Sequence, residues 1–86
     1  MANYGRTRAG TAKALINRAA FVKGYQEVHR GLPLDPDWGK NTNEQWYYER
    51  GRLFASVFDG RLKNGRRVTY EAQRQLSNAI NQGSII

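Results

Sequence analysis

The sequence predicts an all-α fold, namely a two-helix hairpin with a third short C-terminal helix. Apolar residues recur at three- and four-residue steps in two segments, which is the period of an amphipathic helix. Between these segments, a Gly-Leu-Pro sequence gives a helix stop and a Thr-Asn-Glu-Gln sequence gives a helix start. The chain has 86 residues. A chain of this length forms a single small domain with a thin core.

The first helix is expected over residues 11–30, after a flexible basic arm over residues 1–10. Gly31 follows the last periodic apolar residue, and Pro33 cannot continue a helix, so the segment ends there. The apolar positions of this helix are Ala12, Leu15, Ala19, Phe21, Val22, Tyr25 and Val28.

The connection over residues 32–41 contains both prolines of the chain and several Asp and Asn residues, which favour turns. We expect Leu34 and Trp38 to pack back onto the helices from this loop. Thr42 and Gln45 fit a capping box, in which each side chain satisfies one free backbone N–H group.

The second helix is therefore expected over residues 42–60, with Gly60 as its C-terminal stop. Its apolar face consists of Tyr47, Gly51, Phe54, Ala55, Phe58 and Leu62, and Trp46, Leu53 and Val57 widen it. Most of the core is predicted to come from Phe21, Tyr25, Tyr47, Phe54 and Phe58.

Two glycines lie inside these helical patterns, Gly24 in the first and Gly51 in the second. Glycine inside a helix costs about 1 kcal/mol relative to alanine. Each of the two glycines has an aromatic residue close to it in sequence, Tyr25 in one helix and Tyr48 in the other. The matching positions predict that the two helix backbones approach closely at the glycines.

The segment from Lys63 to Arg67 is expected to be a basic turn, because Asn64-Gly65 suits a positive backbone φ. Thr69 is the expected cap of a third helix over residues 69–81. Val68 and Tyr70 leave a short strand open as an alternative in this region.

The composition favours an anionic partner. The chain has 14 Lys and Arg against 7 Asp and Glu, a formal charge of +7, and arginine supplies most of the cations. Guanidinium groups bind phosphate through two hydrogen bonds and stack on bases, so we expect nucleic acid. RNA, DNA and an acidic protein all remain open as partners.

The sequence favours no membrane, redox or catalytic function. No apolar run approaches the roughly 20 residues of a membrane span, and no signal-peptide core follows Met1, so we expect a cytoplasmic protein. The single histidine, His29, lacks a nucleophile and an orienting carboxylate at suitable spacing. Histidine, cysteine and carboxylate spacing predicts no metal site. We therefore expect no enzyme activity, no cofactor and no small-molecule substrate.

Two basic arrays are the candidate binding sites. In the second helix, Arg50 and Arg52 alternate with the aromatic residues before them, which suits stacking on exposed bases. The second array lies around the basic turn, where like charges repel unless an anion neutralises them. The predicted nucleic-acid-binding residues are Arg50, Arg52, Arg61, Lys63, Arg66 and Arg67, with Lys23 and Arg30 as a second line.

The chain resembles the ribosome modulation factor family between Phe21 and Ala55. The family pattern is a Gly-Tyr pair near the end of a first helix, a glycine six residues later, a proline in the connection, and an aromatic residue followed by glycine and alanine. The matching residues are Gly24, Tyr25, Gly31, Pro36, Tyr48, Gly51 and Ala55. The chain departs from the pattern at Asp35, where the family has cysteine, and at Arg52, where it has tryptophan.

The resemblance implies binding to ribosomal RNA on the small ribosomal subunit and control of translation. The departure at Arg52 affects the family's dimerising surface more than its RNA binding. Similar Gly-Tyr hairpins occur in small phage proteins, so two alternatives stay open. One is a phage-type adaptor or inhibitor that binds a host protein such as RNA polymerase, and the other is a virion component. A helix-turn-helix DNA reader fits less well, because the connection of about ten residues is too long.

Overall fold

The computed structural model describes residues 9–83 and 85. Its elements are α1 (Ala9–Ile16), α2 (Ala19–His29), α3 (Thr42–Ala55), β1 (Lys63–Asn64), β2 (Arg67–Val68) and α4 (Tyr70–Asn81). The fold is thus mainly helical. The alternative of a short strand is correct only for β1 and β2, which have two residues each. The expected basic arm over residues 1–10 lies outside the described residues, apart from Ala9 and Gly10, which open α1.

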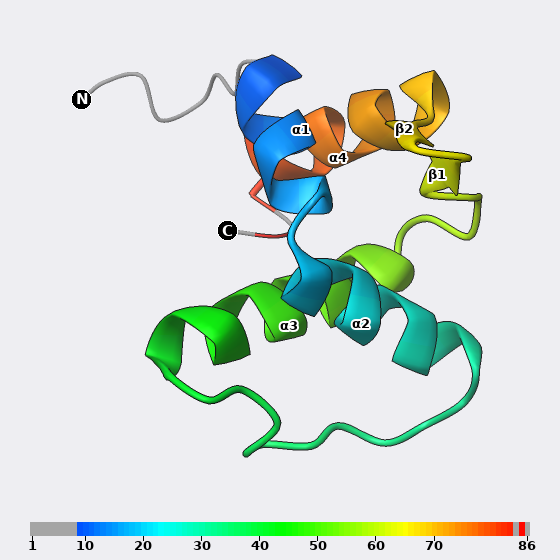
Figure 1. Ribbon diagram of the computed structural model, residues 1–86. Coiled ribbons are helices and arrows are strands. Elements are labelled where there is room, and N and C mark those ends of the chain that lie inside the picture. The colour runs from blue at the N-terminus through cyan, green and yellow to red at the C-terminus, as the bar shows by residue number, and fades with distance from the viewer. Residues whose placement is uncertain (1–8, 84, 86) are drawn as a thin grey trace.

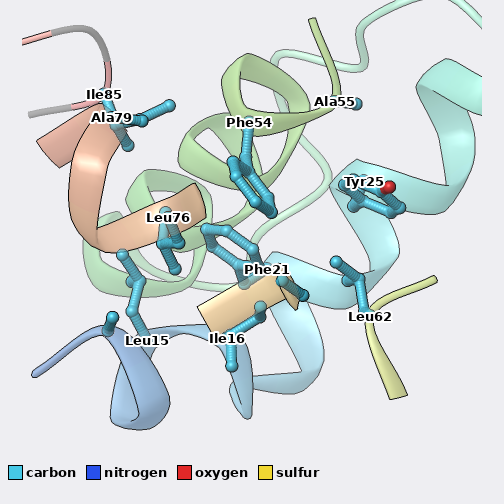
Figure 2. Packing of buried hydrophobic residues seen from close by; sticks show 12 residues of the cluster. Leu15, Ile16, Phe21, Tyr25, Phe54, Ala55, Leu62, Leu76, Ala79 and Ile85 are labelled. Atoms are coloured by element: carbon cyan, nitrogen blue, oxygen red, sulfur yellow. The ribbon is translucent and has the colours of Figure 1, made fainter. Parts of the chain in front are cut away.

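The elements form two layers, as Figure 1 shows. Helices α2 and α3 pack together in one layer, while α1, α4 and the β1–β2 hairpin form the other. The loop over residues 30–41 runs from the end of α2 back along this pair to the start of α3. The core lies between the layers, with the rings of Phe21 and Phe54 at its centre, 5.9 Å apart (Figure 2).

The expected first helix over residues 11–30 is in fact two helices. Arg18 is extended, with φ −69° and ψ 132°, and the chain turns there. The Asn17 side chain donates to the Lys13 carbonyl at 2.8 Å, a local bond by which asparagine competes with continued helix. A straight helix could not pack against both layers, because Leu15 and Ile16 lie toward α4 while Phe21 lies toward α3 (Figure 2).

The two helical glycines lie at the contact between α2 and α3, as predicted. A Cβ added at Gly24 would overlap the Tyr48 carbonyl group, with the carbonyl carbon 3.0 Å away. A Cβ added at Gly51 would overlap the Phe21 carbonyl group, with that carbon 2.8 Å away. The missing side chains therefore let the two backbones touch.

The predicted core is partly wrong in its choice of tyrosine. Tyr48, not Tyr47, is fully buried, while Tyr47 and Phe58 are half-buried and pack against the edge of the core. Tyr48 turns inward because it shares a face with Gly51, which carries the close contact with α2. As expected, Trp38 packs back from the loop, where it stacks on Tyr48 at 5.0 Å.

The second helix starts and ends differently from the prediction. Its N-cap is Asn41 rather than Thr42, since the Asn41 side chain accepts from the Glu44 N–H at 2.9 Å. Glu44 in turn accepts from the N–H of Lys40, the residue before the cap, at 2.9 Å, so Asn41 and Glu44 take the places predicted for Thr42 and Gln45. The helix ends at Ala55 instead of Gly60. A tight turn follows, in which the Val57 N–H donates to the Phe54 carbonyl at 3.0 Å.

The remaining stop and start signals are confirmed. Gly31 has φ +75° and closes the end of α2, while Leu32 N–H donates to the Glu27 carbonyl at 2.9 Å. Thr69 caps α4 by accepting from the Ala72 N–H at 3.1 Å. The basic turn is a β-hairpin in which Lys63 pairs with Val68, and Gly65 has φ +68° at its tip.

Candidate nucleic-acid interface

A polar hollow lies in the layer that contains α1, the hairpin and α4. It has a volume of about 470 Å³, and we call it the basic cleft. It is lined by Lys13 and Asn17 of α1, by Arg66, Arg67 and Val68 of the hairpin, and by Gln73 of α4. Lys63 lies at its edge, where its Nζ donates to Asn17 Oδ1 at 2.9 Å.

Three cations of the basic cleft have no anionic partner among the residues that the structure describes. None of the lining residues is acidic, and Lys13, Arg66 and Arg67 are exposed. Within residues 9–83 and 85, these three side chains take part in no ion pair or hydrogen bond. Their donors are therefore available to an anion such as a phosphate group.

The local sequence explains why these side chains meet. Lys13 and Asn17 are four residues apart in and just after α1, so they lie on one side of it. The two-residue tip of the hairpin turns the chain back, which brings Arg66 and Arg67 toward α1. The hydrogen bond from Lys63 to Asn17 joins the hairpin to the end of α1 beside the cleft.

The predicted site residues fall into two groups, and the cleft unites only part of them. Lys63, Arg66 and Arg67 are at the basic cleft. Arg61 is exposed just before β1, where its carbonyl accepts from the Thr69 hydroxyl at 2.8 Å. The other predicted residues, Lys23, Arg30, Arg50 and Arg52, belong to the α2–α3 layer.

Two residues of that second group are engaged by a buried carboxylate. Glu27 is only 7 % exposed, and it lies 3.1 Å from the Arg52 guanidinium and 3.6 Å from Lys23 Nζ. Arg52 also donates to the Leu32 carbonyl at 3.0 Å, and the Tyr48 hydroxyl donates to Glu27. Burial and this hydrogen bond raise the pKa of Tyr48. Arg52 therefore ties the loop to both helices.

Arg50 has an aromatic partner rather than an acidic one. Its guanidinium lies 4.8 Å from the Trp46 ring centre, and its buried Nε atom has no hydrogen-bond partner among the described residues. Arg18 makes the same contact with the half-buried Tyr47, also at 4.8 Å. The expected alternation of arginine and aromatic rings thus exists, but the protein's own cations occupy those rings.

Sequence reasoning missed Lys13, Asn17 and Gln73 as cleft residues. The available signal was the four-residue spacing of Lys13 and Asn17, which predicts a polar patch on one helix side. No pattern in the sequence predicts that this patch faces the hairpin, because the pairing of α1 with α4 depends on long-range packing.

A second hollow, with a volume of about 410 Å³, lies in the α2–α3 layer. We call it the apolar groove, since Leu34 and Leu53 line it and are 50 % and 41 % exposed. Its other lining residues are Val28, Glu49, Arg50, Arg52 and Ser56. The groove shares no residue with the basic cleft.

The described residues offer no cluster of metal ligands. His29, the only histidine, has Nε2 3.2 Å from the Phe58 carbonyl oxygen and its ring edge against Tyr25. Within residues 9–83 and 85, no three His, Asp or Glu side chains gather as metal ligands. In the same part of the chain, no helix is both long and apolar enough to cross a membrane.

Compared with known proteins, the chain matches no family model, no curated protein and no solved structure. The resemblance to ribosome modulation factor stays a prediction.

Proposed function

We propose that this chain is a non-catalytic RNA-binding protein that acts on the ribosome and modulates translation. The basic cleft is the surface that holds the RNA phosphates. The observation that carries the proposal is the meeting of Lys13, Arg66 and Arg67 around one polar hollow, without a carboxylate among its lining residues. The choice of the ribosome as target rests on the Gly-Tyr hairpin resemblance alone.

The chemistry of the cleft suits a phosphate backbone. Arginine presents a planar fork that donates two hydrogen bonds to one phosphate, and Arg66 and Arg67 are neighbours at the tip of a hairpin. The formal charge of +7 also attracts a polyanion from a distance. Such contacts give affinity for RNA without selecting its sequence.

The salt dependence of RNA binding tests this proposal. Four phosphate contacts, from Lys13, Lys63, Arg66 and Arg67, predict that log Kd rises with log salt concentration with a slope of about 3 to 4. Filter binding or fluorescence anisotropy with a labelled structured RNA measures this slope. Binding that is independent of salt, or no binding at low salt, would overturn the proposal.

A pair of matched variants assigns the binding to the cleft. Arg66→Gln combined with Arg67→Gln removes two positive charges, and the slope should fall by about two. Lys40→Glu lowers the net charge by the same amount at an exposed loop residue outside the cleft. Equal losses for the two variants would show that only net charge matters.

Cosedimentation with ribosomes tests the target. Wild-type protein should travel with the small ribosomal subunit in a sucrose gradient, and the double arginine variant should stay near the top. If the protein binds RNA in solution but does not cosediment with ribosomes, the RNA-binding proposal stands and the ribosome is wrong as the target.

The apolar groove favours a second candidate function. A groove with exposed leucines on a protein of this charge suits a partner protein with apolar and acidic residues. The chain would then be a phage-type adaptor or inhibitor that grips a host protein such as RNA polymerase.

A pull-down from lysate, with and without nuclease, separates the two candidates. Ribosomal proteins that are lost after nuclease treatment support RNA binding. Polymerase subunits that survive nuclease, and are lost with Leu53→Asp but not with the double arginine variant, support the adaptor.

A further inference from the structure

Tyr70 is the most exposed large hydrophobic side chain among the described residues. It is 79 % exposed, whereas Val57 and Leu34, the next two, are 54 % and 50 % exposed. Among residues 9–83 and 85, it contacts no other ring and makes no side-chain hydrogen bond. Most of this residue is therefore accessible to a ligand.

The ring is presented from a fixed position. Tyr70 is the first residue of α4, directly after the capping residue Thr69. Thr69 makes two hydrogen bonds to the segment before β1, since its hydroxyl donates to the Arg61 carbonyl at 2.8 Å and its N–H donates to the Leu62 carbonyl at 2.9 Å. The backbone below Tyr70 is thus held by the hairpin, so little order is lost when the ring binds a ligand.

Tyr70 also stands beside the basic cleft. Val68, two residues earlier, and Gln73, three residues later, both line the cleft. Residues three apart on a helix are surface neighbours with Cβ atoms about 5–6 Å apart. Tyr70 does not line the cleft itself, but it lies between two of its lining residues in the chain and follows the hairpin that carries Arg66 and Arg67.

We propose that Tyr70 stacks on an unpaired base of the RNA strand whose phosphates the basic cleft holds. This inference rests on the proposed RNA binding and adds the class of RNA, namely a loop, bulge or single-stranded end. Bases in a continuous duplex are already stacked on one another, so an exposed tyrosine gains nothing there. Proteins that bind single-stranded nucleic acid place aromatic side chains, on which bases stack, beside cations that contact the backbone.

The experiment compares two RNAs with the same number of phosphates, a stem with an unpaired loop and a fully paired duplex. Tyr70→Ala should weaken binding to the loop RNA by about 5- to 150-fold, the range for the loss of one stacked base. Its affinity for the duplex should stay unchanged. Tyr70→Phe keeps the ring and should restore loop binding, whereas Val57→Ala, at an exposed residue of the other layer, should change neither affinity.

The outcomes separate this inference from the proposed function. If Tyr70→Ala binds the loop RNA as wild type does, while the double arginine variant is weakened, stacking is wrong and the cleft stands. If Tyr70→Ala loses affinity equally for both RNAs, the ring does not read unpaired bases and the inference is also wrong. If wild-type protein binds neither RNA, both proposals fall.

Discussion

Gly51 of α3 lies directly against the carbonyl group of Phe21 in α2, and this contact has a reciprocal partner. Gly24 of α2 lies in the same way against the carbonyl group of Tyr48 in α3. At both places the space that a Cβ would need is filled by backbone of the other helix, which has no flexible end to move aside. The pair of glycines therefore sets the distance between α2 and α3.

Alanine at either glycine should destabilise the protein. Alanine favours a helix by about 1 kcal/mol over glycine, but the overlap at Gly51 forces the helices apart. We expect a net loss of about 2 kcal/mol in the free energy of unfolding for Gly51→Ala, measured by urea denaturation. Asn78→Ala, at an exposed position of α4, should cost nothing. A Gly51→Ala variant as stable as wild type would contradict the close packing.

The buried carboxylate of Glu27 should make Arg52 a stabilising residue. Arg52→Met keeps the length of the side chain but removes its donors to Glu27 and to the Leu32 carbonyl. We expect a loss of about 1–3 kcal/mol, because those acceptors then lack their partner. Arg74→Met is the matched control, since Arg74 pairs with Glu71 at the surface and should change little. Thermal unfolding measures both variants.

RNA affinity of the same two variants separates structure from binding at Arg52. If Arg52 only holds the loop to the helices, Arg52→Met should bind RNA with wild-type affinity under conditions in which it is folded. A loss of affinity in a fully folded Arg52→Met variant would support the predicted contact with nucleic acid.

Stability should fall at alkaline pH because of Tyr25. Burial, and then the nearby Asp59 carboxylate, raise its pKa to about 12 from the ordinary value of 10.0. The folded state thus holds the phenol proton more tightly than the unfolded state does. This stabilisation is complete below pH 10 and is lost as the pH rises toward 12.

The measurement is the urea midpoint between pH 9 and 12 for wild type and for Tyr25→Phe. The hydroxyl donates to the Gly60 and Phe58 carbonyls, so the variant should be less stable at neutral pH. Its midpoint should also fall less steeply with pH than that of wild type. Parallel pH curves for the two proteins would exclude Tyr25 as the cause.

The N-cap of α3 can be tested by neighbouring substitutions. Asn41→Ala should cost about 1 kcal/mol, because the Glu44 N–H loses its acceptor. Thr42→Ala should leave the stability almost unchanged, since Thr42 is the first helical residue rather than the cap. Denaturation of the two variants gives the comparison, and a larger loss at Thr42 would restore the predicted cap.

Local signals in the sequence predicted much of the fold. Gly31 and Thr69 mark a helix end and a helix start in the structure as they do in the sequence, because a positive φ and a capping hydroxyl act over a few residues. The close approach of two helices at Gly24 and Gly51 was also predicted from the sequence. Glycine inside a helix costs stability, so its presence indicates a place where a side chain would not fit.

Features of the fold that depend on residues far apart in the sequence could not be predicted in the same way. The chain breaks at Asn17 and Arg18 because α1 packs on α4 and α2 packs on α3, which no local pattern reveals. Tyr47 and Tyr48 are adjacent aromatic residues of one helix, so periodicity favours neither strongly. The glycine contact and the buried Glu27 select Tyr48.

The candidate site divides along the same line. The sequence by itself determined the surplus of arginine and the basic turn, because composition and turn chemistry are local properties. Only the tertiary structure decided which cations work together, since it joins Lys13 to Arg66 and Arg67 and sets Lys23 and Arg52 against Glu27. The physical reason is that a charge is available to a ligand only where folding brings no opposite charge to meet it.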